Sequence, residues 1–212
     1  CPSHLKKKKN GADLRTDSPV QAVRRTAQGV EVRVWGGEWE AFDEVIFATH
    51  SDDTLAMLSD PTEAEQRALG AIRYQPNDIV LHADTSIMPK RRSTWASWVY
   101  TEDREQKSDR IDLTYWMNSL QPIPQDDPHF VTLNTKRTIR EELIYDQVTL
   151  RHPVYDLAAL AAQEEVRAFN GSQNTWFCGA WMRHGFHEDG LASAVDVVER
   201  MQTARAAPLA AE

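Results

Sequence analysis

The sequence predicts a mixed fold of the α/β or α+β class, and three features of the chain carry that prediction. Near the start, short segments with alternating apolar residues are separated by turn residues, as in an antiparallel β-meander. Residues 44–48 then form a continuous apolar run that is typical of a buried strand. Toward the end, two segments with helical apolar spacing flank one further apolar strand. The 212 residues are enough to bury a core, in one domain or in interleaved parts.

The meander is predicted from the period-two alternation of its side chains. Residues 30–35 alternate most clearly, and Gly36 and Gly37 supply a turn after them. We expect these segments to be extended: residues 13–16, 19–26, 30–35, 39–42 and 44–48.

Two helices are expected next. Residues 51–58 form a short candidate that Ser51 can cap. The second helix has a good start signal, because Asp60 can cap it, Pro61 suits the first helical position and Glu63 can reach back to the cap. It is expected to end near Gly70.

Residues 71–150 are predicted to be rich in β-structure, with aromatic residues concentrated there. We expect an antiparallel sheet with one face covered by aromatic side chains, joined by polar loops at 101–110 and 121–128. The expected strands are residues 78–82, 94–100, 112–118 and 130–134. The aromatic residues are Trp95, Trp98, Tyr100, Tyr115 and Trp116.

The end of the chain is predicted to be helix, strand and helix. Residues 155–169 have helical spacing and stop at Asn170-Gly171. Residues 175–180 form an apolar strand, and a loop at 181–188 leads to Asp189, a candidate cap. The apolar face of the last helix is expected to contain Leu191, Ala194, Val195 and Val198.

Composition excludes several classes of protein. The net charge of −8 argues against non-specific nucleic-acid binding. No apolar run approaches the roughly 20 residues that span a bilayer, and the lysines at 6–9 are not followed by the apolar stretch of a signal peptide. Two cysteines, Cys1 and Cys178, cannot build a disulfide framework or a four-thiolate zinc site. A reducing, cytoplasmic location is the expectation, with Cys178 a buried thiol.

The densest group of chemically able residues lies in a loop between the last strand and the last helix: His184, Gly185, Phe186, His187, Glu188, Asp189, Gly190 and Leu191. Such a loop presents backbone N–H groups and the positive end of a helix dipole to a ligand. Gly185 and Gly190 have the spacing of a P-loop. However, Leu191 and Ala192 stand at its Lys and Ser/Thr positions, and two acidic residues precede them, so nucleotide triphosphate hydrolysis is excluded.

Three interpretations of this loop remain open on spacing alone. His184, His187, Glu188 and Asp189 are able to bind a metal, although their spacing is not that of a zinc protease. The loop could instead hold a cofactor, where glycine permits close approach. The third interpretation is a capped loop with incidental histidines. A second candidate site, Ala48, Thr49 and His50, follows the core strand, where ligands of α/β sheets usually bind.

Several segments resemble the FAD-dependent amine oxidase and phytoene desaturase superfamily. The closest similarity is to its bacterial branch of predicted flavin-containing amine oxidases and NAD/FAD-binding proteins. The segments are TWFCGAWMRHGFHEDGLASAVDVVERM, MPKRRSTWASWVY and DEVIFATHSDDTLAMLSDPTEAEQRALGAIRYQPNDIVLHAD. The resemblance covers residues 13–203, and FHEDGL together with ATHSDDTL is its most specific part.

The resemblance implies the C-terminal portion of a two-domain FAD/NAD(P)-binding fold, in which a substrate domain is inserted into a discontinuous FAD domain. Residues 1–10 and 205–212 would be tails. The FAD domain would comprise 11–53 and 151–204, and the substrate domain 54–150. The resemblance also implies that the glycine-rich N-terminal Rossmann segment, G-x-G-x-x-G, and its acidic ribose-binding residue lie outside this sequence. The chain would then be the distal part of a larger protein, with Cys1 a cut end.

The resemblance also assigns cofactor contacts. Val20 would meet the adenine through its backbone, and Ala48, Thr49 and His50 would lie near the cofactor. Gly179 and Ala180 would approach the pyrophosphate or ribityl chain, although many members have an acidic residue where Ala180 stands. Gly190 and Leu191 would open a helix facing the flavin, with His184, Gly185, Phe186 and His187 beside it.

The implied function is FAD-dependent transfer of hydride from an apolar or amine-bearing small molecule to flavin, by the full-length protein rather than by this fragment alone. No residue is a compelling catalytic acid or base. Trp95, Trp98, Tyr100 and Trp116 could form a wall of the substrate cavity or simply a core. The basic run Lys90-Arg91-Arg92 is expected to be a solvated face. The alternative function is a binding or scaffold domain that kept the fold and lost the cofactor.

Overall fold

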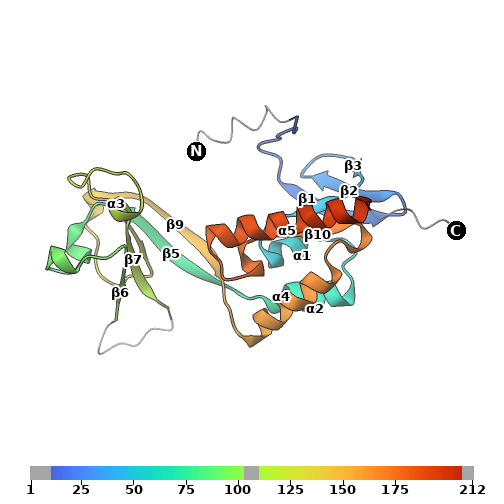
Figure 1. The fold of residues 1–212 in the computed structure, drawn as a ribbon. Helices are drawn as coiled ribbons and strands as arrows, with labels where there is room; N and C mark the ends of the chain where they lie inside the picture. Colours follow the sequence, from blue (N-terminus) through green and yellow to red (C-terminus); the bar gives the residue numbers. More distant parts are fainter. Residues whose placement is uncertain (1–10, 103–109, 207–212) are drawn as a thin grey trace. The chain divides into compact units, whose positions relative to one another are not determined.

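The computed structural model describes residues 11–102 and 110–206, so the expected tail at 1–10 lies outside the described residues (Figure 1). The chain divides into two compact units. Unit 1 comprises Cys1–Arg73 and Pro153–Glu212, and unit 2 comprises Tyr74–His152. In the described ranges, no helix has the length and apolar character needed to cross a membrane.

Unit 1 begins with the expected antiparallel meander. Strands β1 (Val20–Thr26), β2 (Gly29–Val34) and β3 (Trp39–Phe42) pair in the order β1-β2-β3. The short strand predicted at 13–16 is absent, and that prediction is wrong. Arg15 in this segment instead binds the carboxylates of Asp13 and Glu40. Four polar-rich residues without an apolar face have nothing to bury against a sheet.

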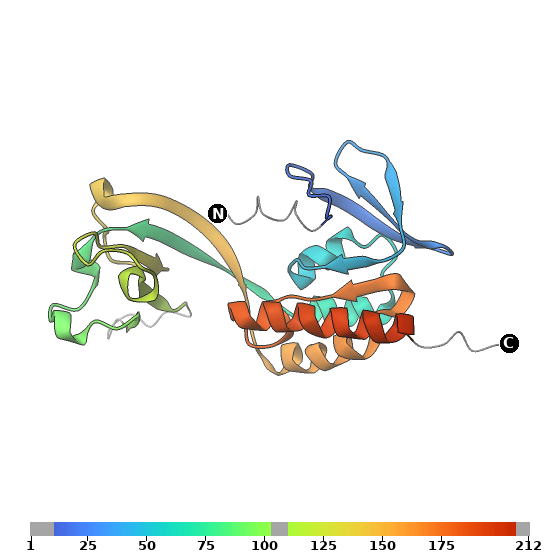
Figure 2. The same cartoon turned by 45° about the horizontal axis from the view of Figure 1, so that its top comes forward.

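A second, parallel pair of strands follows from the two apolar runs. Strand β4 (Val45–Phe47) lies beside β10 (Thr175–Phe177), with Trp176 opposite Ile46 and Phe177 opposite Phe47. The rings of Phe47 and Phe177 stack at 5.8 Å. The long helix α5 (His187–Ala206), drawn in red in Figures 1 and 2, packs on this pair through a core of Trp176, Cys178 and Val197.

The first two helices form where expected but begin differently. Helix α1 (Ser51–Met57) has His50 as its N-cap, so Ser51 is its first helical residue and not its cap. Helix α2 (Glu63–Ala71) is capped by Thr62, which forms a capping box with Glu65. The predicted cap Asp60 is instead bonded by the backbone N–H and guanidinium of Arg25. Asp60 therefore forms a tertiary ion pair with Arg25 and does not cap the helix.

The last helix buries different residues from those predicted. Helix α4 (Leu157–Phe169) is capped by Asp156, and it ends at Asn170. Helix α5 buries Ser193 and Val197, with Ala194 and Met201 partly buried, whereas three residues of the predicted apolar face are exposed. Those three are Leu191, Val195 and Val198. Helical spacing predicted a single apolar face, and packing against the neighbouring strands buries a different stripe of α5.

Unit 2 contains a five-stranded sheet in the order β6-β7-β8-β5-β9. Its strands are β5 (Tyr74–His82), β6 (Trp98–Thr101), β7 (Asp112–Trp116), β8 (Phe130–Leu133) and β9 (Ile144–Pro153). The β-rich region is confirmed, but β6 is shorter than predicted and β9 was missed. Nearly all of β9 is exposed, including its alternating apolar residues Val148 and Leu150, and sequence analysis assigned no strand to it. The remaining short helices are α3 (Met117–Leu120), η2 (Thr85–Ile87), η3 (Arg92–Thr94), η4 (Glu141–Leu143), η5 (Ser172–Asn174) and η6 (Ala180–Met182).

The two units begin and end at positions other than 54 and 150. Helices α1 and α2 belong to unit 1, and unit 2 starts at Tyr74. The physical reason is packing of α2 in unit 1, where Leu69 is fully buried and Arg67 pairs with Glu165 of α4.

A buried polar chain crosses one face of the sheet in unit 2. The Nδ1 of His82 accepts the backbone N–H of Asp84 at 3.1 Å, so its proton is on Nε2, which lies 2.8 Å from Thr132 Oγ1. Thr132 is in turn 2.9 Å from Thr114 Oγ1. His82 is fully buried, and burial lowers its pKa below 6.5.

The stability of unit 2 is therefore expected to fall as the pH is lowered through about 6.5, because the unfolded chain then binds a proton at His82 that the folded chain resists. Denaturant unfolding followed by tryptophan fluorescence between pH 8 and 5 measures this slope. The H82Q variant keeps a donor and an acceptor without titrating, so its slope over this range should be smaller. An equal slope in both proteins would contradict the assignment.

Candidate functional site

The ends of β4 and β10 bring the two predicted site segments together. Because the strands are parallel and Phe177 lies opposite Phe47, Ala48 and Gly179 leave the same edge of the pair. The backbone N–H of Cys178 donates to Phe47 O at 2.9 Å and continues the ladder to this edge. Ala48, Thr49 and His50 therefore lie beside Gly179 and Ala180, although about 130 residues separate them in sequence.

Hydrogen bonds hold the first of these segments in place. The indole Nε1 of Trp181 donates to Thr49 O at 3.0 Å. Thr49 Oγ1 is 2.8 Å from Thr54 Oγ1, and Thr54 N donates to His50 O at 2.8 Å. Both ends of the Thr49-His50 turn are thus fixed, one to η6 and one to α1. Trp181 was missed by sequence analysis, where it counted only as the start of a loop.

The second segment is tied to helix α5 by a serine. Ser193 Oγ accepts the backbone N–H of Gly179 at 2.9 Å and donates to Gly190 O at 2.8 Å. Ser193 is buried, and its two bonds fix the strand end against the first turns of the helix. Sequence analysis missed Ser193, whose only sequence signal is its helical spacing of three residues from Gly190.

Helix α5 starts at His187, two residues before the predicted cap. Asp189 lies inside its first turn, and its Oδ2 accepts the backbone N–H groups of Phe186 at 3.0 Å and His184 at 3.2 Å. Asp189 thus satisfies donors of the preceding loop, as the acidic residue of a capping box does. The loop residues His184, Gly185, Phe186 and His187 are exposed.

Backbone conformation and neighbouring atoms constrain the three glycines of the site to different degrees. Gly179 has φ +149°, and a Cβ there would lie 2.7 Å from Trp181 Nε1. Gly185 has φ +93°, and a Cβ there would lie 2.7 Å from the hydroxyl of Tyr155. Gly190 is helical, and a Cβ there would make only ordinary contacts, the nearest at 3.7 Å from Ala180 N. The fold therefore requires Gly179 and Gly185 but does not require Gly190.

The remaining residues predicted to contact the cofactor do not cluster at the edge of the β4–β10 pair. Val20 is the first residue of β1, opposite Val34, and it is 38% exposed. It belongs to the meander and not to the β4–β10 pair. Leu191 is exposed on α5. Cys178 is buried as expected, and burial raises the pKa of its thiol, as for an inert core cysteine.

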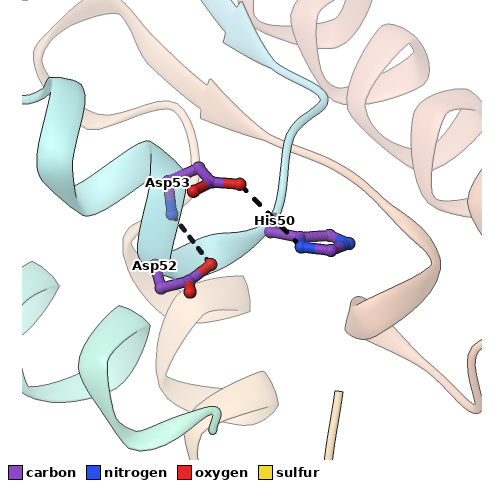
Figure 3. A group of neighbouring side chains, drawn as sticks. All are labelled: His50, Asp52 and Asp53. Atoms are coloured by element: carbon purple, nitrogen blue, oxygen red, sulfur yellow. Dashed lines mark hydrogen bonds and ion pairs between the residues drawn. The ribbon is translucent and has the colours of Figure 1, made fainter. Parts of the chain in front are cut away.

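A cluster of metal-ligating groups occurs in the described residues, but it is not the one considered from sequence. The ligand atoms of His50, Asp52 and Asp53 lie within 4.8 Å of one another. Figure 3 shows the three side chains at the start of α1. His50 Nδ1 is 3.8 Å from Asp53 Oδ2, and Asp53 N donates to Asp52 Oδ1 at 2.9 Å. The two carboxylates stand in the first turn of α1, where the helix dipole favours them without any ion.

The aromatic residues of unit 2 do not form a single wall. Trp95 packs edge-on against Trp116 and Phe130, and Phe130 is fully buried. Trp98 and Tyr100 are on the opposite side of the sheet and are exposed. Trp95 and Trp116 are partly buried and pack around Phe130, and the expectation of one face covered by the aromatic residues is wrong. Lys90, Arg91 and Arg92 are exposed, as expected.

A cavity of about 410 Å³ opens on α4 and α5, and it is lined in part by Arg167, Arg183 and Arg200. Each of these arginines is already engaged. Arg200 donates to the carbonyls of Arg167 and Asn170 at the end of α4, and Arg183 pairs with Asp196. The guanidinium of Arg167 donates to Met182 O. These bonds give the arginines a structural role in capping and joining helices.

Together, the parallel strand ends, the glycines Gly179 and Gly190 beside them and the start of helix α5 define an α/β protein of the cofactor-binding class. A family model described as flavin-containing amine oxidoreductase matches residues 1–118. The chain belongs to this family, which confirms the resemblance in the sequence and the assignment of a flavin, FAD, as cofactor.

Two solved structures are similar in fold. One is a CLA-producing fatty acid isomerase from P. acnes, with a TM-score of 0.56 and 14% identity over 86% of this chain and 47% of that chain. The other is a reduced UDP-galactopyranose mutase, with a TM-score of 0.65 and 12% identity over 95% of this chain and 50% of that chain. The chain thus spans about half the length of these structures, and they confirm the mixed α/β fold. No curated protein matches the sequence.

Proposed function

We propose that this chain is part of an FAD-dependent oxidoreductase that takes hydride from an apolar or amine-bearing small molecule. The observation that carries the proposal is the junction of β4, β10 and α5, where Ala48-Thr49-His50 lies beside Gly179-Ala180 and Gly190 is close to Ala180. The family match supports the cofactor, and the geometry of the junction supports its location.

The residues at this junction suit a large, flat, anionic cofactor. Gly179 and Ala180 have no bulky side chain and are only partly buried, so a pyrophosphate or ribityl chain could approach their backbone. Gly190 adds a second small position at the start of α5. The exposed loop at 184–187 would provide further contacts, with His184 and His187 as its polar side chains. Val20 would contact the adenine through its backbone.

The start of helix α5 would stabilise negative charge on the flavin. When bound, the flavin supplies the redox chemistry by accepting hydride, and negative charge then develops on its ring. The N-terminal turn of α5 would present backbone N–H groups and the positive end of the helix dipole to that charge. Ser193 holds the turn against Gly179, so its position is set before the cofactor binds.

The full-length protein would supply the glycine-rich Rossmann segment. The β4–β10 pair is a two-stranded parallel sheet among the described residues, and parallel sheets are normally larger and covered on both faces. Helix α5 also exposes Leu191, Val195 and Val198 at helical spacing. A further α/β segment would bury both features. We also propose a reducing cytoplasmic location, which the low cysteine count supports.

Each compact unit would have one task. Unit 1, which contains the meander and the strand-end junction, would hold the cofactor. Unit 2, which contains the five-stranded sheet, would bind the substrate.

Substituting Gly190 by alanine tests the cofactor site in the full-length protein. Because the added Cβ meets nothing closer than 3.7 Å, stability should be kept or raised by up to about 1 kcal/mol through helix propensity. Flavin content should nevertheless fall at least about tenfold, because the methyl group occupies the approach to the cofactor. Absorption near 450 nm and thermal unfolding measure the two effects.

Gly70 in α2 gives a matched control, because a Cβ there also makes only an ordinary contact, 3.6 Å from Leu55 Cδ2. G70A should keep its flavin. Equal flavin content in G190A and wild type would indicate that the cofactor does not bind next to this helix. A full-length protein that neither contains nor takes up flavin would favour the scaffold function.

A further inference from the structure

Three consecutive backbone carbonyls next to the candidate cofactor site are held by side chains of helix α4. Gln163 Nε2 donates to Trp181 O at 2.8 Å and to Arg183 O at 2.7 Å. Arg167 Nη2 donates to Met182 O at 2.6 Å. The carbonyls belong to η6 and to the residue after it, in the connection from β10 to α5. Helix α4 therefore fixes this connection from one side.

Gln163 is the buried member of this pair of donors. It is 6% exposed, whereas the side chain of Arg167 is 39% exposed. Both acceptors of Gln163 are carbonyl oxygens, so only its amide nitrogen, which carries two N–H donors, can face them. A buried carbonyl that loses its donor raises the free energy of the folded state. An amide side chain is therefore required at this position of α4.

The three bonded carbonyls belong to peptide units that also reach the candidate site. The described peptide bonds are all trans, so the N–H of each unit points away from its carbonyl. The backbone N–H groups of residues 182–184 donate in turn to Gly179 O at 3.0 Å, Ala180 O at 3.2 Å and Asp189 Oδ2 at 3.2 Å. Each peptide unit thus links α4 to a residue beside the proposed flavin.

The peptide unit between Arg183 and His184 shows this link most directly. Its carbonyl accepts from Gln163, and its N–H donates to Asp189 in the first turn of α5. Rotation of this unit would break both bonds, so the amide of Gln163 and the start of α5 are held in one arrangement. The same reasoning applies to the unit that follows Trp181 and bonds to Gly179 O.

We propose that Gln163 is a positioning residue for the flavin, because it fixes the peptide units that hold Gly179, Ala180 and the start of α5 in place. The inference rests on the proposed oxidoreductase function, and it adds a residue of α4 to the same site. Without the amide, these peptide units are free to rotate, and cofactor binding then has to order them. Weaker flavin binding is the expected consequence.

Asn170 offers a matched control at the end of the same helix. It is 7% exposed, its Nδ2 donates to Phe177 O at 2.9 Å, and its Oδ1 accepts the backbone N–H of Phe177 at 2.8 Å. This amide therefore matches Gln163 in burial and in number of bonds. Its bonds end on β10 and not on the connection to α5, so its loss should lower stability without a specific effect on flavin binding.

Titration of FAD into the flavin-free full-length protein tests the proposal. We expect Q163M, which keeps the length of the side chain without its donors, to raise the Kd for FAD about tenfold. N170L should stay within about threefold of wild type, although both variants lower the thermal unfolding temperature. R167M removes only the partly exposed donor to Met182 O, so it should raise the Kd by about threefold and serves if Q163M fails to fold.

Amide hydrogen exchange of the 212-residue chain without flavin measures the hold on the connection itself. The His184 amide should exchange at least about tenfold faster in Q163M than in wild type, and at the wild-type rate in N170L.

The proposal is overturned if Q163M and R167M bind FAD like wild type, or if Q163M and N170L raise the Kd equally. An unchanged exchange rate of the His184 amide in Q163M also overturns it. A wild-type protein that binds no FAD overturns the proposed function together with this inference, whereas equal FAD affinity of wild type and Q163M overturns this inference alone.

Discussion

Replacing Arg25 by alanine is expected to lower the free energy of unfolding by about 3–5 kcal/mol. The side chains of Arg25 and Glu65 are each only 6% exposed, and Arg25 Nη2 lies 2.5 Å from Glu65 Oε1. Arg25 Nε also donates to Thr175 Oγ1 at 3.1 Å, and Thr175 is fully buried. One guanidinium therefore joins β1, α2 and β10, and its removal leaves a carboxylate buried without a cation.

Chemical denaturation of R25A and wild type measures this loss. R24A is the control from the next position of the same strand, because the Arg24–Glu31 pair is partly exposed and should contribute about 1 kcal/mol or less. The double variant R25M/E65L removes both charges and should recover part of the loss, because Glu65 also forms the capping box with Thr62. If R25A and R24A cost the same, the buried pair does not have the role assigned to it.

Substituting Gly179 by valine is expected to have the second large effect. A β-branched residue at φ +149° is strained by about 1–3 kcal/mol, and contact with the ring of Trp181 adds a similar cost. Displacing Trp181 also breaks its bond to Thr49 O, so the two strand ends lose their alignment. We expect a loss of several kcal/mol together with loss of flavin binding.

Thermal unfolding and flavin content of the full-length protein check this prediction. G190A provides the contrast, because it should affect flavin content without loss of stability. If G179V were as stable as wild type, the positive φ and the Trp181 contact would not constrain this position. Gly179 is thus expected to be needed for folding, whereas Gly190 is expected to be needed only for flavin binding.

The local patterns of the chain predicted much of the fold correctly. Alternation over 30–35 and the apolar runs at 44–48 and 175–180 identified strands that the structure contains, because burial on one or both faces leaves a periodic signal. The pattern failed where burial is absent, as in β9, and where tertiary partners compete for a residue. Asp60 was predicted to cap a helix but binds Arg25, and Thr62 caps the helix instead.

The candidate site was likewise only partly predictable from the sequence. Residue types marked the strand end at Ala48-Thr49-His50 and the loop before α5, and family resemblance proposed that they share a cofactor. Only the parallel pairing of β4 with β10 brings these segments to one edge. Trp181 and Ser193 hold them there through hydrogen bonds to Thr49 O and Gly179 N, and no local pattern signals these contacts between different segments.

The sequence by itself determined the class of fold, the flavin family and most of the strands and helices, because these depend on side-chain periodicity and on short motifs. The tertiary structure decided which stripe of α5 is buried, that Trp98 and Tyr100 lie on the opposite face of the unit 2 sheet from Trp116, and which glycines the fold needs. Those outcomes depend on the register and packing of segments distant in sequence, so the free energy that selects them is not present in any one segment.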